Sequence, residues 1–206
     1  MKILAALALM AVLGGCAVGV THQYDNATPT LKASTGSKLN VGVQDRRLYV
    51  VSKQKPANFV GLSRGGFGNP FDVNTASGKP LADDFSKSIQ TALAAQGVKA
   101  SAVSLPLGID EGEAIKRLAA AGDKAVLIVL NEWKSDTFTH TTLTYDVQAL
   151  VVDGSGKVLS SKKITGTDNL GGNAFNPPEH SRNAVPPAFR KKLEELFAAP
   201  EISKHI

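Results

Sequence analysis

The chemistry most clearly marked in this 206-residue sequence belongs to one thiol near its start, that of Cys16. Cys16 is the only cysteine, so the chain cannot form an internal disulfide. It is preceded by Lys2, an apolar run from Ile3 to Leu13 and small residues ending at Gly15. This is the layout of a secretory signal peptide. The run is too short for a transmembrane helix, which needs about 20 apolar residues, so the sequence predicts export with cleavage near Gly15.

The residues Leu13-Gly14-Gly15-Cys16 resemble the lipobox of bacterial lipoproteins. The resemblance implies that the Cys16 sulfur is thioether-linked to diacylglycerol, that the bond between Gly15 and Cys16 is cleaved, and that the new amino terminus is acylated. Several acyl chains anchor a protein stably, whereas one chain binds only marginally. The alternative is an ordinary signal peptide, with Cys16 incidental. Ala17 is not the aspartate that retains many such proteins at the inner membrane, so we expect an outer-membrane protein facing the periplasm.

Length and composition predict one globular domain. Removal of residues 1–15 leaves 206 − 15 = 191 residues, enough for one full core and too few for two ordinary domains. We expect a lipidated cysteine and flexible tether over residues 16–38, and a single domain over residues 39–206. The 23 basic residues are scattered among 18 acidic ones rather than gathered in a stripe, which argues against nucleic acid as a partner.

Hydrophobic periodicity predicts the elements of this domain. Alternation from Leu39 to Val43 indicates a first strand that Leu48–Val51 can continue, and the apolar run 125–130 indicates a strand covered on both faces. The glycine- and proline-rich stretches 52–79 and 168–187 are expected as loops. Further helices are predicted near 80–97, 110–122 and 187–199, and further strands near 98–103, 137–152 and 158–167. The predicted fold is α/β (α+β), a mixed sheet in the order β-α-β-α-β-β-β-α with helices mainly on one face.

The glycine-rich segment 61–71, GLSRGGFGNPF, is the most tempting binding loop. Backbone amides before a helix can hold a phosphate, but neither a P-loop nor a GxGxxG pattern is present. Three interpretations remain open: a mobile surface loop, a protein-binding loop with Arg64, Phe67 and Phe71 as contacts, and an anion site. Asn173, in the second predicted loop, is a further candidate contact for a protein partner.

Other polar and aromatic clusters have simpler explanations. Asp45-Arg46-Arg47 ends a strand, where α/β sheets bind ligands, but a solvated charge cluster or local ion pair is the simpler interpretation. Trp133, Phe138 and Tyr145 fit packing better than an exposed aromatic patch. The histidines lack metal-ligand spacing, so we predict surface or structural roles, with no metal and no cofactor, for His22, His140, His180 and His205.

The layout of the predicted domain resembles the YajG-type family of small bacterial lipoproteins. The resemblance is carried by Leu81–Val98, Ala125–Leu130 and Thr144-Tyr145-Asp146-Val147. It implies an outer-membrane lipoprotein without known catalysis, and it assigns no active-site residues. A weaker similarity links the chain to the TolB amino-terminal and LpoB-type envelope domains, which act by binding other proteins.

The sequence therefore predicts a membrane-tethered, non-enzymatic binding or assembly factor with an envelope protein as its partner. Its contact loops would be residues 61–71 and 168–185. One alternative is an envelope hydrolase or transferase whose acid and base groups come from residues such as Asp45, Asp146 and His140. The other alternative is a sensor for a small ligand or glycan. A fold by itself does not separate these classes.

Overall fold

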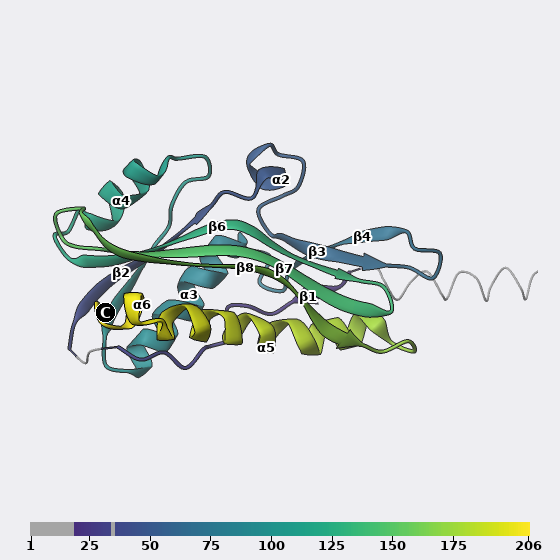
Figure 1. Cartoon of the computed structure of the whole chain (residues 1–206). Helices are drawn as coiled ribbons and strands as arrows, with labels where there is room; N and C mark the ends of the chain where they lie inside the picture. Colours follow the sequence, from purple (N-terminus) through teal and green to yellow (C-terminus); the bar gives the residue numbers. More distant parts are fainter. Residues whose placement is uncertain (1–18, 34–35) are drawn as a thin grey trace, which may run out of the picture.

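A computed structural model of the chain describes residues 19–33 and 36–206. The predicted cleavage and lipidation sites, Gly15 and Cys16, lie outside the described residues. The strands are β1 (Thr21–His22), β2 (Lys38–Asp45), β3 (Phe59–Arg64), β4 (Pro70–Thr75), β5 (Lys99–Val103), β6 (Lys124–Thr137), β7 (His140–Val152) and β8 (Val158–Gly172). The helices are α2 (Leu48–Val51), α3 (Leu81–Ala95), α4 (Glu111–Ala119), α5 (Pro177–Ala198) and α6 (Pro200–Ser203) (Figure 1).

The long strand β6 is the centre of a mixed, curled sheet. The first half of β6 pairs in parallel with β2, up to Leu130 opposite Asp45. Its last residues pair in parallel with β3, beginning at Ser135. Along its other edge β6 pairs antiparallel with β7, which in turn pairs with β8. Beyond β2 lies the parallel strand β5, so the predicted parallel strands and the predicted antiparallel meander are both present.

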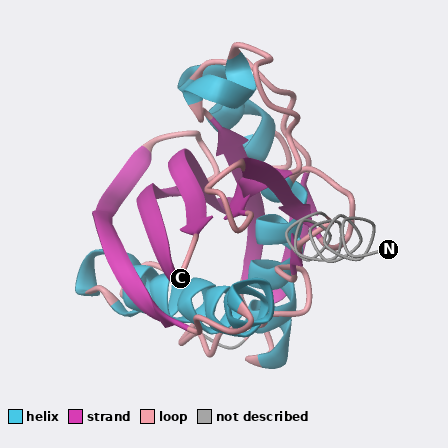
Figure 2. Ribbon diagram, turned by 90° about the vertical axis from the view of Figure 1, so that its right-hand side faces the viewer, coloured by secondary structure: helices cyan, strands magenta, loops and turns pink. Residues whose placement is uncertain are grey.

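Helices cover mainly one face of this sheet, as predicted. Figures 1 and 2 show α3 and α5 below the sheet and α4 above it. The larger core lies between the sheet and the helices α3, α5 and α6, where Phe85, Trp133 and Phe189 stack edge to face. A smaller core lies between the opposite face and α4, built on Leu118 and Leu127. Two cores arise because β6 is apolar at every position from Ala125 to Leu130 and must be covered on both sides.

The expectation of a flexible tether over residues 16–38 is wrong for the part of it that the structure describes. Val20, Tyr24 and Leu31 are buried members of the main core. The Tyr24 ring lies between Phe85, Trp133 and Phe189, and its hydroxyl accepts a hydrogen bond of 3.1 Å from the Trp133 indole nitrogen. The buried side chains alternate as in extended chain, at positions 20, 22 and 24 and again at 27, 29 and 31. Only Val20, Tyr24 and Leu31 among them are large and apolar, so the sequence shows no sustained hydrophobic alternation.

Two other predicted loops contain regular structure. The stretch 52–79 forms an antiparallel hairpin of β3 and β4, whose turn is residues 65–69. The stretch 168–187 continues β8 to Gly172 and then begins α5 at Pro177, after an Asn176 cap. Pro186 and Pro187 lie inside α5, although prolines usually interrupt helices. They are tolerated here because the carbonyls that they leave unpaired, those of residues 182 and 183, belong to exposed residues that water can reach.

Candidate functional site: a cleft at the carboxyl ends of β2 and β5

A cleft of about 660 Å³ opens where β2 ends, between α2 and the start of α4. Its lining residues are Asp45, Arg46, Leu48, Val51, Gly108, Ile109, Asp110, Glu111 and Asn131. The loop 104–110 that follows β5 forms one wall, and a hydrogen bond of 2.6 Å from the Gln44 amide to the Ile109 carbonyl holds that wall in place. The cleft thus lies outside the carboxyl ends of parallel strands, where open α/β sheets bind ligands.

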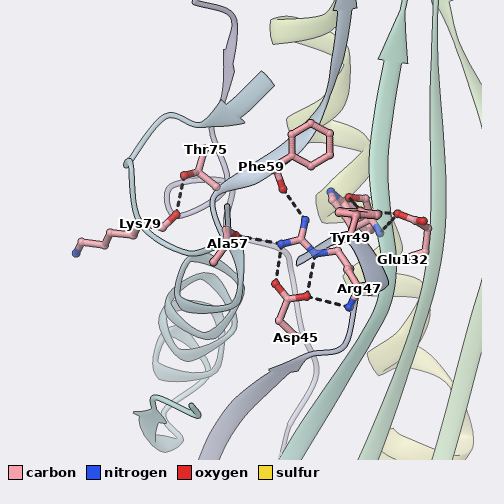
Figure 3. Close-up of polar contacts among 9 residues, drawn as sticks. Asp45, Arg47, Tyr49, Ala57, Phe59, Thr75, Lys79 and Glu132 are labelled. Carbon is pink, nitrogen blue, oxygen red and sulfur yellow. Dashed lines mark hydrogen bonds and ion pairs between the residues drawn. The ribbon is translucent and has the colours of Figure 1, made fainter. Parts of the chain in front are cut away.

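The segment between β2 and β3 leaves the sheet, and the buried side chain of Arg47 holds it in place. The Arg47 guanidinium is fully buried and makes a two-pronged contact with Asp45, at 2.9 Å from Nε and 2.6 Å from Nη2. It also donates to the backbone carbonyls of Phe59 and Ala57 (Figure 3). One charged side chain therefore ties the end of β2 to the start of β3 across a 13-residue excursion, residues 46–58.

The charge of Arg47 is retained in this buried position. Burial lowers the pKa of Arg47, but the hydrogen bonds and negative charge of Asp45 outweigh burial and hold that pKa above its ordinary value. Such a pair is expensive to break, because either partner alone would be a charge buried without compensation. The prediction of a local ion pair at Asp45-Arg46-Arg47 is confirmed. The alternative of a solvated cluster is wrong for Asp45 and Arg47, because both side chains are buried.

Tyr49 fixes α2 from a second side. Its hydroxyl donates to the Glu132 carboxylate at 2.6 Å and lies 3.2 Å from the Trp133 carbonyl (Figure 3). Burial, together with the neighbouring Glu132, raises the pKa of Tyr49 although Arg47 opposes this. On this edge of β6, pairing with β2 ends at Leu130 and pairing with β3 begins at Ser135. Tyr49 contacts the residues of β6 between these two points.

Arg47 and Tyr49 together hold the short helix α2 so that two of its apolar side chains point outward. Leu48 is 82% exposed and Val51 42% exposed, and their spacing of three residues places them on one side of α2. Leu107, across the cleft wall, is a third exposed aliphatic residue. Carboxylates of Asp110 and Glu111 stand at the rim, where Arg46 approaches Glu111 at 4.0 Å. The cleft therefore combines exposed aliphatic side chains with a mainly acidic rim.

The residues predicted as partner contacts lie elsewhere, at one end of the sheet. Arg64 pairs with Asp136 through two hydrogen bonds of 2.8 and 2.6 Å. Phe67 is exposed at the tip of the β3–β4 hairpin, and Phe71 is half-buried close to that tip, opposite Ser63. Asn173 follows β8, where its side-chain oxygen accepts hydrogen bonds from the Phe175 and Asn176 amides. The structure brings the two predicted contact loops to the same end, and their role in binding stays a prediction.

The suggested acid–base set of Asp45, Asp146 and His140 is not assembled. His140 and Asp146 are six residues apart on β7, a separation of about 20 Å along a strand. Asp146 pairs with Lys163 at 2.8 Å, and Asp45 is occupied by Arg47. Within residues 19–33 and 36–206, no group of three histidine, cysteine, aspartate or glutamate side chains is placed to hold a metal ion.

The other predicted residues divide between core and surface. Trp133 and Tyr145 are buried as expected for packing residues, whereas Phe138 is 45% exposed. His22 is a fully buried structural histidine, and burial, aided by the Arg182 charge, lowers its pKa to about 3. Sequence reasoning missed the cleft because the apolar run Leu48–Val51 was expected to continue the first strand, whereas it forms the helix α2. The one available signal was the density of charge at residues 45–47, directly after a strand.

Neither a protein-family model nor a curated protein sequence matches the chain. Among solved structures, a DUF330 protein from Xanthomonas campestris is similar, with 12% identity, a TM-score of 0.50, and coverage of 86% of this chain and 94% of that one. Lipoprotein GNA1162 from Neisseria meningitidis has 14% identity and a TM-score of 0.30, over 77% of this chain and 98% of that one. The first similarity supports the fold alone. The chain is thus a mixed α+β domain, and the resemblance to the YajG-type family stays a prediction.

No helix in the described part of the chain is long and apolar enough to cross a membrane.

Proposed function

We propose that this chain is a lipid-anchored, non-enzymatic protein of the bacterial envelope that binds a protein partner through the cleft beside α2. The observation that carries the proposal is the exposure of Leu48 and Val51 on a helix that Arg47 and Tyr49 hold rigidly from behind. A pre-organised apolar pair loses little conformational freedom on binding, so more of the contact energy appears as affinity. Exposed apolar groups rimmed by polar ones are typical of interaction sites.

The chemistry of the cleft defines the kind of segment that it would accept. Leu48, Val51 and Ile109 offer aliphatic contacts, and Asp110 and Glu111 offer negative charge at the rim. An apolar segment flanked by lysine or arginine complements this surface, because opposite charges at a rim steer association and select the partner. The cleft lining holds no aromatic side chain, and aromatic side chains are what a sugar-binding site would be expected to use.

The chemistry of the same cleft also supports a role without catalysis. Its deepest carboxylate, that of Asp45, is engaged by three hydrogen bonds from Arg47, including one from the backbone amide. A general base needs a free lone pair within reach of the proton that it removes. Asp110 caps α4 by accepting from the Glu113 amide at 2.8 Å. The acidic groups of the cleft are thus used mainly to hold the fold.

The anchoring part of the proposal rests on Leu13-Gly14-Gly15-Cys16 and the apolar run before it. Mass spectrometry of the amino-terminal peptide from cells should show Cys16 as the first residue, carrying the mass of its acyl chains. A Cys16→Ser variant should be recovered from the soluble fraction or as uncleaved precursor. An unmodified Cys16 in a membrane-free protein would contradict lipid anchoring.

The binding part is tested with a photo-reactive amino acid placed at Leu48 in cells. The matched control position is Leu159, which is 38% exposed on β8, away from the cleft. One dominant protein adduct at position 48, absent at position 159 and abolished by Val51→Glu, is the expected result. Equal adducts at both positions, or an adduct that Val51→Glu leaves unchanged, would show that the cleft is not the binding surface.

A further inference from the structure

A second surface, at one end of the sheet, carries an unusual concentration of exposed aromatic rings. Phe67, Phe138 and Phe175 are 88%, 45% and 100% exposed, while the other five phenylalanines of the chain are buried or half-buried. Each exposed ring belongs to a different connection: residues 65–69 between β3 and β4, residues 138–139 between β6 and β7, and residues 173–176 between β8 and α5. We call these three connections the phenylalanine tips.

The strand register places all three tips at the same end of the molecule. Ser63 at the end of β3 pairs with Thr137 at the end of β6. His140, which begins β7, pairs with Gly172 at the end of β8. The three connections therefore leave the sheet side by side, at the right-hand end in Figure 1.

The path of the chain before β1 leads to that same end. β1 runs parallel to β4, with Thr21 opposite Asn74. Gly19 and Val20, which lead into β1, therefore approach from the side where β4 begins, next to the hairpin tip. The five residues from Cys16 to Thr21 span at most about 18 Å, and the four residues from Pro70 to Asn74 span about 13 Å. A lipid on the Cys16 sulfur can thus reach the level of the tips but cannot extend far beyond them.

The short connection between Cys16 and the core limits how far the domain can stand from the bilayer. If residues 16–38 were free, the domain could stand clear of the bilayer, but the chain is already packed into the core from Val20 onward. A membrane that holds acyl chains on Cys16 must then lie close to the end that bears Phe67, Phe138 and Phe175. The opposite end of the domain is turned away from it.

The chemistry of the tips suits the boundary between lipid and water. None of the residues in 65–69 (GGFGN), 138–139 (FT) and 173–176 (NAFN) is charged. The nearest charges on β3 and β6, Arg64 and Asp136, neutralise each other in a two-pronged pair. By contrast, the turn 153–157 at the other end of β7 and β8 carries Asp153 and Lys157. Aromatic rings flanked by small polar residues favour the headgroup region of a bilayer.

We propose that the phenylalanine tips form a membrane-contact face that inserts Phe67, Phe138 and Phe175 into the bilayer surface around the acyl anchor. This inference rests on the anchoring part of the proposed function and assigns to lipid the loops that the sequence suggested for a protein partner. It orients the domain, because α2, which lines the cleft, lies above the sheet and away from the right-hand end that bears the tips (Figure 1). The cleft therefore lies off the membrane-contact face and stays open to a partner. Two separate contacts, one with lipid and one with protein, would then fix the domain at the membrane.

The test uses the lipidated full-length protein, in which Cys16 is modified and any introduced cysteine is the only free thiol. Phe67→Cys, Phe138→Cys and Phe175→Cys are each labelled with an environment-sensitive fluorophore and reconstituted in vesicles of phosphatidylethanolamine and phosphatidylglycerol. The control is Leu159→Cys, labelled in the same way. Lipids that carry a quencher in the upper acyl chain should remove most of the emission at the three tips and leave the Leu159→Cys signal unchanged.

Each outcome distinguishes this inference from the function on which it rests. Unquenched tip labels on protein whose mass shows acylated Cys16 would overturn the membrane-contact face and leave the anchor intact. Tip labels with blue-shifted emission but no quenching by lipid would show that the tips bury against protein instead, which also overturns it. If the mass shows no acyl chain and the labels stay unquenched, the anchor and the membrane-contact face both fail.

Discussion

The buried pair of Arg47 and Asp45 provides a sharp test of how the cleft is held together. In Arg47→Met a long apolar side chain replaces the guanidinium, so the volume is nearly kept while the charge and the donors are lost. The substitution removes two charge-assisted hydrogen bonds to Asp45 and leaves the carbonyls of Phe59 and Ala57 without this donor. The Asp45 carboxylate is then buried without a counter-charge.

The expected loss of unfolding free energy is about 3–5 kcal/mol, the usual result of removing one partner from a buried ion pair. A domain of this kind has a total stability of only about 5–15 kcal/mol, so the effect should be a large shift in the urea midpoint. The comparison variant is Arg64→Met, which breaks the pair with Asp136. Both side chains of that pair are about one-third exposed, at 35% and 31%, so its loss should cost no more than about 1 kcal/mol.

A double variant, Asp45→Asn with Arg47→Met, separates the two contributions. Removing the stranded charge should restore part of the stability lost in Arg47→Met, because a neutral amide is much less costly to bury than a carboxylate. Urea unfolding followed by circular dichroism measures all four proteins at pH 7. The reasoning is refuted if Arg47→Met costs no more than Arg64→Met, or if the double variant is less stable than Arg47→Met alone.

Three further outcomes are expected. Burial holds the pKa of His22 at about 3 in the folded protein, whereas the pKa of an unfolded histidine is about 6.5, so acid favours the unfolded chain. The free energy of unfolding of the wild type, relative to that of His22→Gln, should fall by about 1.4 kcal/mol per pH unit below pH 6.5. Parallel urea-unfolding profiles of the two proteins across pH would contradict this. Gly61→Ala places a methyl group against the Ser135 side chain and carbonyl and should cost about 1–3 kcal/mol, whereas Gly66→Ala, which faces open space, should cost less than about 0.5 kcal/mol in urea unfolding. Leu48→Glu should leave the urea midpoint unchanged while abolishing partner crosslinking, and a destabilised Leu48→Glu would mean that the side chain has a structural role.

Much of the sheet could be predicted from local sequence alone. The uninterrupted run Ala125–Leu130 indicates a strand covered on both faces, and the alternation over residues 143–151 indicates a half-covered neighbour. These predictions are confirmed because the spacing of apolar residues along a strand reflects which of its faces are buried. The hairpin turn at Asp153–Gly156 and the helix that ends before Gly97 followed from equally local signals.

What local sequence could not decide was the role of polar or irregular stretches whose partners are distant in the chain. Residues 19–33 resemble a linker until Tyr24 is seen against Trp133, 109 residues away. Arg47 resembles a surface charge in the sequence, and only the folded structure shows that its guanidinium is buried and donates to the carbonyl of Phe59.

The sequence by itself determined β2, β5, β6, β7 and β8, the three longest helices and the lipobox pattern, because each of these depends on neighbouring residues only. The tertiary structure alone decided the buried ion pair, the exposed apolar face of α2 and the gathering of Phe67, Phe138 and Phe175 at one end, because each depends on strand register and long-range packing. The physical reason is that burial of a charge, or exposure of an apolar ring, is a property of its surroundings and leaves no periodic trace in the chain.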